Sequence, residues 1–346
     1  MKVLHLHFGK DGGAERFFVA LVGAFGRRDV EQRFVIRPNR GWRGEIESLG
    51  PIVESNYRRR SILSWLLERR VRRMCDDWRP DAIMAWMPRA AQLIPARADA
   101  VKLARLGDFP DDLGRFGTCD VLVGNVPAIG DHCRDLGWTK PVVTISNFAR
   151  PVTPMPVDRA TFDTPADAFL VCGVGRFVHR KGMDLLIRAA ARVPGAWLWL
   201  VGDGRERAAL EALAAEVGIA ERTRFLGWQP EPIHLIAAAD VLGLPSRHEP
   251  FGNVAIEGWQ AGVPVVSTRS EGPGWYMTDG ADGCLVEIDD ETGFAAALEL
   301  CRDRDFAARL VAGGRATLEA RFGEEAIARD YLRLFSGDLT DPMARG

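Results

Sequence analysis

Short apolar runs alternate with segments of helical periodicity along most of the chain, and this alternation constrains the fold more than any other feature. In the first half, the runs cover residues 2–7, 33–37, 81–86, 120–123 and 142–145. In the second half, they cover residues 168–173, 197–202, 224–227, 240–244, 264–268 and 283–287. Alternating strands and helices indicate parallel sheets. We therefore predict an α/β fold with two doubly wound, Rossmann-like domains that face each other across a cleft.

The domain boundaries follow from length and from the distribution of proline. The chain has 346 residues, which suits two domains of ordinary size. Four prolines lie close together without apolar periodicity, at Pro151, Pro154, Pro156 and Pro165. We expect a first domain at 1–150, a linker at 151–165, a second domain at 166–322, and a C-terminal helix within 323–346 that can cross back to the first domain before a short tail.

Composition indicates a globular protein of the cytoplasm. Apolar residues make up 47% and charged residues 27% of the chain. No apolar run approaches the roughly 18 to 20 residues that a membrane span needs, and the N-terminus lacks a signal-peptide pattern. The six cysteines are scattered without a CxxC pair, which is typical of reduced thiols and indicates neither a zinc site nor a disulfide framework. We expect a cytoplasmic protein without a nucleic-acid partner.

The segment after the run that ends at residue 244 carries two carboxylates eight positions apart, Glu249 and Glu257. If a helix begins near Gly252, its first N–H groups form a pocket for an anion such as a diphosphate. Glu249 would then be free to accept hydrogen bonds from sugar hydroxyls, and Glu257 would suit a ribose diol. A helix cap beside a solvated glutamate is the alternative interpretation.

A second segment, residues 173–182, combines glycines with two cations, Arg176 and Lys181. Glycine permits close approach of a ligand to the backbone, and two cations five positions apart can bind a diphosphate. The segment lacks the third glycine of a dinucleotide fingerprint and the spacing of a P-loop, which disfavours both classes. Further glycine turns occur at 202–204 and at 226–228, and simple turn chemistry is the alternative explanation for them.

Together and in this order, the segments resemble the family 4 glycosyltransferases. The resemblance covers roughly residues 169–286. It consists of Gly175-Arg176 with Lys181-Gly182, Gly202 and Gly204, Pro245-Ser246, the Glu249-x7-Glu257 signature, and Gly262 to Val266. The resemblance implies the two-domain GT-B fold. It also implies retaining transfer of a hexose from a nucleotide-diphosphate sugar to a glycan or lipid-linked acceptor, often in envelope or lipopolysaccharide synthesis.

The resemblance also implies roles for individual residues. Arg176 and Lys181 would bind the donor diphosphate, and with Glu249 they would form the catalytic set. Glu257 would bind the ribose. The donor sugar and its phosphate would contact Glu249, Phe251, Gly252, Asn253 and Val254. From the first domain, Gly12 and Gly13 resemble the family's glycine-rich first loop.

One departure from the family concerns the first domain. Many members carry a histidine near the end of a strand there, whereas this chain has residues 103–109 without a histidine. Asp108 or backbone groups would serve instead, or the sugar would sit differently. Asp108 is the acceptor-site candidate, with a solvated loop aspartate as the alternative.

Neither a metal nor another cofactor is required by this scheme, since the cations and the helix N–H groups would stabilise the leaving diphosphate. The Asp303-x-Asp305 pattern is expected to be solvated surface. Two other functions stay open: a sugar-nucleotide epimerase of the same fold, and a non-catalytic protein that binds sugar nucleotides.

The two halves of the chain differ in charge. Residues 1–150 hold 25 Lys and Arg against 18 Asp and Glu, a net of +7, and the remainder has a net of −9. Within 58–73 there are seven arginines, beside the helical stripe Leu63, Leu67, Val71 and Met74. This pattern predicts either a peripheral contact with the anionic inner membrane or a core-facing helix with a solvated basic face.

Overall fold

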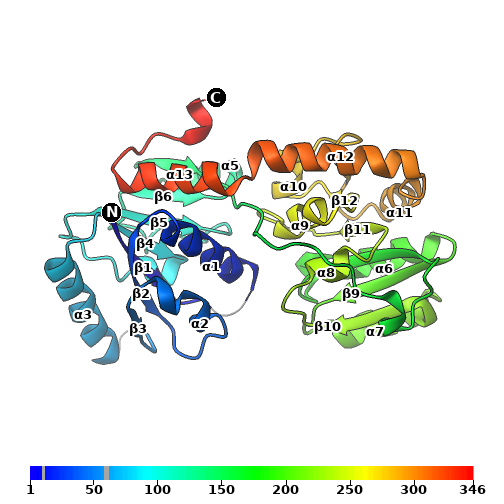
Figure 1. Ribbon diagram of the computed structural model, residues 1–346, viewed down its shortest axis with the longest axis horizontal. Coiled ribbons are helices and arrows are strands. Elements are labelled where there is room, and N and C mark those ends of the chain that lie inside the picture. The colour runs from blue at the N-terminus through cyan, green and yellow to red at the C-terminus, as the bar shows by residue number, and fades with distance from the viewer. Residues whose placement is uncertain (10–11, 58–61, 346) are drawn as a thin grey trace. The chain divides into compact units, whose positions relative to one another are not determined.

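The computed structural model describes residues 1–9, 12–57 and 62–345, and it divides into two compact units (Figure 1). The first unit consists of Met1–Arg150 and Glu324–Gly346, and the second consists of Pro151–Gly323. Each unit is built around its own parallel sheet.

The sheet of the first unit has seven strands within the described residues, in the order β3-β2-β1-β4-β5-β6-β7. Its strands are β1 (Lys2–His7), β2 (Glu31–Ile36), β3 (Ile52–Glu54), β4 (Ala82–Trp86), β5 (Val101–Leu106), β6 (Val121–Gly124) and β7 (Val142–Thr144). The strands β3 and β5 were absent from the predicted runs. β3 is only three residues long, and β5 contains Lys102 and Arg105, which interrupt its apolar pattern.

Helices cover the first sheet, and the C-terminal helix is one of them. They are α1 (Gly13–Gly26), α2 (Arg43–Ile46), α3 (Ile62–Trp78), α4 (Pro88–Ala91), α5 (Pro127–Asp135) and α13 (Glu324–Phe335), with short 3-10 turns at Glu47–Leu49 and Pro342–Arg345. Buried side chains of α1 and α13, such as Phe25 and Phe335, share one core with Phe34 and Met84 of the sheet. The last helix of the chain is therefore part of the first unit's core.

The sheet of the second unit has six strands in the order β10-β9-β8-β11-β12-β13. Its strands are β8 (Phe169–Val174), β9 (Ala196–Val201), β10 (Thr223–Gly227), β11 (Val241–Leu244), β12 (Val265–Thr268) and β13 (Cys284–Val286). All were predicted to within two residues at each end. With the first sheet, they confirm the predicted α/β class with two doubly wound parallel sheets.

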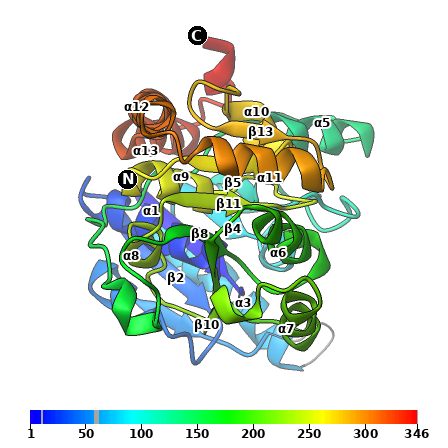
Figure 2. The same cartoon turned by 90° about the vertical axis from the view of Figure 1, so that its right-hand side faces the viewer.

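The helices of the second unit are α6 (Met183–Arg192), α7 (Arg207–Glu216), α8 (Ile233–Ile236), α9 (Asn253–Ala261), α10 (Glu271–Tyr276), α11 (Glu291–Leu300) and α12 (Arg304–Arg321). Short 3-10 turns lie at Arg159–Phe162, His179–Lys181 and Ala220–Arg222. α6 and α11 pack against each other (Figure 2), and their apolar residues form one core with those of α7 and the sheet. α9 packs on β11, β12 and α12.

The strand order places two loops at a switch point of the second sheet. β8 lies between β9 and β11, so the chain leaves β8 toward one side and returns to its other side at β11. In open α/β sheets, ligands bind at the carboxyl ends of the strands at this point. The segments after β8 and β11 are those that carry the predicted site residues of this unit.

Candidate functional site

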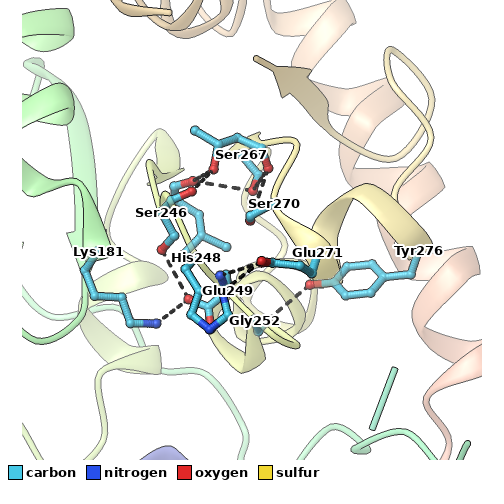
Figure 3. A network of polar contacts seen from close by, with 11 residues as sticks. Lys181, Ser246, His248, Glu249, Gly252, Ser267, Ser270, Glu271 and Tyr276 are labelled. Atoms are coloured by element: carbon cyan, nitrogen blue, oxygen red, sulfur yellow. Dashed lines mark hydrogen bonds and ion pairs between the residues drawn. The ribbon is translucent and has the colours of Figure 1, made fainter. Parts of the chain in front are cut away.

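The loop between β11 and α9 holds a buried carboxylate, that of Glu249. This residue is 8% exposed. Its Oε2 atom accepts a hydrogen bond from Ser246 Oγ at 3.2 Å and forms an ion pair with Lys181 Nζ (Figure 3). One of the two carboxylate oxygens of Glu249 therefore already has two partners.

Lys181 reaches Glu249 because the turn after β8 packs directly on the loop after β11. Gly182 adopts a left-handed conformation with φ 64°, and a Cβ there would lie 2.0 Å from the carbonyl oxygen of Pro245. Only glycine permits that approach. The aliphatic part of Lys181 passes over Gly175, whose missing Cβ would lie 3.8 Å from it. The two predicted segments therefore form one cluster.

Helix α10 supports the loop from behind. Glu271 Oε2 accepts the backbone N–H of Glu249 at 3.0 Å, and its Oε1 lies 2.8 Å from Nδ1 of His248 (Figure 3). Burial raises the pKa of Glu271, but hydrogen bonds from the backbone and from His248 outweigh it, and the pKa lies below its usual value. An ionised Glu271 thus fixes the backbone on which Glu249 sits.

Helix α9 begins directly after this loop, as predicted. Its N-cap is Gly252 with φ 85°, a residue without a side chain to cap the helix. Tyr276 donates its hydroxyl to the carbonyl of Gly252 at 3.2 Å, and burial keeps the pKa of Tyr276 well above its usual value, so the hydroxyl stays protonated. The predicted residues Phe251 and Gly252 are buried, whereas Asn253, Val254 and Glu257 are half-buried.

The glycines of the 202–204 turn have a packing explanation, whereas a Cβ on Gly227 would meet nothing within 4 Å among the described residues. A Cβ on Gly202 would lie 1.9 Å from the carbonyl oxygen of Gly175, and one on Gly204 would lie 2.4 Å from that of Phe177. These glycines therefore let the turns after β8 and β9 touch. Arg176 lies in this region, is exposed, and makes no side-chain hydrogen bond or ion pair with the residues that the structure describes.

The other predicted residues lie in the first unit. Gly12 is the N-cap of α1 and Gly13 its first residue, and both are exposed. Asp108 follows β5, is exposed, and accepts the N–H of Phe109 at 3.0 Å. Within the described part of the chain, no three His, Cys, Asp or Glu residues are grouped so that they could hold a metal ion. Asp303 of the Asp-x-Asp pattern caps α12 by accepting the N–H of Phe306.

The basic segment forms helix α3, with its arginines on the outside. Leu67 and Val71 are buried and Met74 is half-buried, while Arg69, Arg70, Arg72 and Arg73 are exposed. The three arginines at 58–60 and the side chain of Leu63 lie outside the described residues. A search of the described helices found none that combines the length and apolar character of a membrane span.

Comparison with known proteins places the chain in a family. A family model described as Glycosyl transferases group 1 matches residues 155–317. The lipopolysaccharide core biosynthesis glycosyltransferase LpsE of Rhizobium meliloti (strain 1021) is 50% identical over 337 residues, which make up 97% of this chain and 99% of the relative. The chain belongs to the group 1 glycosyl transferases, or family 4. It is therefore a nucleotide-sugar-dependent glycosyltransferase.

Solved structures agree with this glycosyltransferase in fold. A sucrose-phosphate synthase from Thermosynechococcus elongatus superposes with a TM-score of 0.83 at 22% identity and covers 97% of this chain and 99% of its own. Anabaena HepE in complex with UDP-glucose superposes with a TM-score of 0.79 at 20% identity and covers 97% and 100%. The predicted GT-B fold of the family is confirmed.

Three residues of this glycosyltransferase that hold its loop in place were not predicted from the sequence, namely His248, Glu271 and Tyr276. The available signal was an acidic residue opening a short helix directly after a buried strand, at Glu271. That signal is common to helix starts, so it could not indicate that the carboxylate bonds a backbone N–H 22 residues earlier.

Proposed function

We propose that this glycosyltransferase moves a hexose from a nucleotide-diphosphate sugar to a lipopolysaccharide core acceptor, with retention of the anomeric configuration. The observation that carries the donor site is the Lys181–Glu249 ion pair beside the N-terminus of α9, whose N-cap is a glycine. The likeness to LpsE supports the acceptor class. Family membership supports the stereochemistry.

Each residue of the site would have a distinct task. Arg176, Lys181 and the N–H groups of Asn253 and Val254 would bind the diphosphate. Glu249, with the backbone of Phe251 and Gly252, would orient the sugar, and Glu257 would accept the ribose hydroxyls. Gly12 and Gly13 would approach the donor from the first unit, and Asp108 would accept an acceptor hydroxyl.

Catalysis would come from charge stabilisation. Negative charge grows on the diphosphate as the glycosidic bond breaks, so fixed cations and N–H groups stabilise the transition state more than the ground state. The acceptor hydroxyl would attack from the face that the diphosphate leaves, and a phosphate oxygen would take its proton. In this scheme Glu249 positions the sugar and does not attack it.

Donor binding is tested by thermal shift with a panel of UDP, GDP and ADP sugars, beginning with UDP-glucose. A ligand at 100 times its Kd adds about 2.7 kcal/mol to the stability of the native state. Transfer is then assayed with core oligosaccharide, and the anomeric configuration of the product is determined by NMR. If the sugar of the donor is inverted at one carbon in an assay that contains no acceptor, the protein is an epimerase instead. Donor binding without turnover would indicate a binding protein.

We also propose that the reaction needs no metal, because protein cations would neutralise the diphosphate. We expect EDTA to leave turnover largely unchanged. Loss of activity in EDTA that magnesium or manganese restores would contradict this proposal.

We further propose that the enzyme works in the cytoplasm as a peripheral protein on the inner membrane, with α3 against anionic lipid. Trp65 and Leu66 are 53% and 51% exposed on the helix that carries the arginines, and Arg69 lies 4.5 Å from the ring centre of Trp65. Aromatic and basic side chains together suit the membrane interface. Co-sedimentation with anionic vesicles should weaken when Arg69, Arg70, Arg72 and Arg73 become Gln; unchanged binding would reject the idea.

A further inference from the structure

The side chain of Arg105, near the end of β5, is a buried cation of the first unit. It is 3% exposed. Its Nε donates to the hydroxyl of Tyr331 at 3.2 Å, and its Nη2 donates to Oδ1 of Asn147. The guanidinium also stacks 4.5 Å from the ring centre of Phe17 and 5.4 Å from that of Trp86.

All of these partners are neutral. Among the residues that the structure describes, no carboxylate forms an ion pair with Arg105. A buried charge is expensive to desolvate unless an opposite charge compensates it, and buried arginines are usually paired for this reason. Aromatic rings and two neutral acceptors offset only part of this cost. The arrangement therefore leaves a positive charge for which the described residues supply no counter-ion.

One nitrogen of Arg105 is also left without a hydrogen bond. Nη1 has no acceptor among the described residues, and it lies beside Gly107, whose missing Cβ would be 3.4 Å away. Gly107 is exposed, so the approach to Nη1 passes over a residue without a side chain. Nη1 carries two N–H groups, which suit the oxygens of a phosphate or a carboxylate.

We propose that Arg105 binds the anionic group, phosphate or carboxylate, of an acidic acceptor, with the oxygens approaching over Gly107. The net charge of +7 in residues 1–150 favours the approach of such an acceptor. Asp108, next to Gly107, would accept a hydroxyl of the same acceptor, so the two side chains would recognise different groups of one molecule. This inference rests on the proposed function, because it assigns the anion to the acceptor.

Steady-state kinetics test the site with three forms of core oligosaccharide: intact, dephosphorylated with hydrofluoric acid, and carboxyl-reduced. We expect Arg105→Gln to raise the KM for the intact acceptor about 10-fold or more, the loss expected for one charged hydrogen bond, with the donor Kd unchanged. For the wild type, either dephosphorylation or carboxyl reduction of the acceptor, whichever removes the group that Arg105 binds, should raise the acceptor KM by a similar factor. The same treatment should change the acceptor KM of Arg105→Gln little. Arg89→Gln, an exposed arginine of the same unit, is the matched control.

Arg105→Gln can disturb the core, so a second variant keeps the arginine and fills the approach. Gly107→Val should raise the acceptor KM by about the same factor while Tm and donor Kd stay unchanged, because its side chain would occupy the space beside Nη1. A normal acceptor KM in a folded Gly107→Val enzyme would overturn the proposal. The proposal would also be overturned if dephosphorylation and carboxyl reduction each changed the acceptor KM by the same factor in wild type and in Arg105→Gln.

Direct binding separates this inference from the assigned reaction. Thermal shift with inorganic phosphate and with acetate needs no turnover, and at least one should stabilise the wild type more than Gly107→Val. If sugar donors fail to bind but this difference appears, the proposed function is wrong and the anion site stands. Absence of any difference with either anion would reject the site.

Discussion

Lys181 and Glu249 are 68 positions apart and meet in a partly buried ion pair, with side chains 17% and 11% exposed. Removing one member of such a pair leaves the other charge without its partner. Under the proposed function, the ammonium group of Lys181, with its three N–H donors, would attract both Glu249 and the diphosphate. Arg176 has no partner of this kind among the described residues and is exposed.

We expect Lys181→Ala to lower kcat by about 100-fold or more, because one charge-assisted contact to the leaving group is worth roughly 3 kcal/mol in the transition state. It should also lower Tm, since Glu249 loses its counter-ion. Arg176→Ala should lower kcat without changing Tm. The exposed Arg309, on α12, serves as a control through Arg309→Ala. Near-normal kcat in both site variants would remove these residues from the mechanism.

Two buried histidines of β1 predict a pH dependence of stability. Burial lowers the pKa of His5 and of His7 from 6.5 to about 3, with a smaller contribution from Arg105 at His7. Below pH 6.5 the unfolded chain therefore binds protons that the folded chain does not. The free energy of unfolding should fall by about 1 kcal/mol for each histidine as the pH drops from 6.5 to 5.5, with a limiting slope of about 1.4 kcal/mol per pH unit at lower pH, and it should depend little on these histidines above about pH 7.5.

Urea unfolding of the first unit at pH 7.5, 6.5 and 5.5 measures this slope. The double variant His5→Phe, His7→Phe should flatten it, whereas His179→Gln, at an exposed histidine, should retain it. The same slope in the double variant as in the wild type would mean that other groups cause the acid sensitivity.

Helix α10 holds the loop between β11 and α9, the proposed donor loop, since Glu271 accepts the N–H of Glu249 and Gly272 donates to the carbonyl of Glu249 at 2.9 Å. The missing Cβ of Gly272 permits this contact, because it would lie 2.3 Å from the carbonyl oxygen of Phe251. The loop conformation therefore depends on a helix from another part of the second unit.

Glu271→Ala should raise the donor Kd about 10-fold, since the N–H of Glu249 loses its acceptor and the loop relaxes. Glu271→Gln retains an acceptor oxygen and should recover most of the affinity. Glu287→Ala, whose carboxylate is 74% exposed and paired with Arg269, is the matched control. Titration calorimetry with the nucleotide diphosphate measures the effect, and an unchanged Kd in Glu271→Ala would show that the loop holds its shape without α10.

At the level of the complete chain, the first unit is assembled from two distant segments. Phe335 of α13 is 1% exposed, and its ring packs 5.3 Å from that of Phe25 in α1. Arg28 adds ion pairs to Glu324 and Glu325 at the start of α13. The first 150 residues therefore lack part of their core until the end of the chain has been added.

Phe335→Ala should destabilise the first unit by about 3 to 5 kcal/mol, the usual cost of removing a buried aromatic side chain. Hydrogen exchange should show faster opening in strands β1 to β7 and no change in β8 to β13. Leu300→Ala, at a residue 56% exposed, is the control. Equal acceleration in both units would mean that the two units unfold together.

Much of the fold and the donor motif could be predicted because both depend on local patterns. Apolar periods distinguish strands from helices, and a strand that ends at residue 244 followed by a helix start near Gly252 places Glu249 in the turn and Glu257 in the helix. Strands β3 and β5 escaped prediction for the same reason: three residues are too few to show a period, and the charges of β5 hide one.

Contacts between distant residues could not be predicted in this way. Glu249 contacts Lys181 through its side chain and Glu271 through its backbone N–H. Arg105 contacts Asn147 and Tyr331, and Tyr331 is 226 positions away in the sequence. Periodicity gives the face of an element on which a side chain lies. The packing of strands and helices decides which side chain of another element contacts that side chain, and whether a buried charge has a counter-ion. This packing forms only when the whole unit folds.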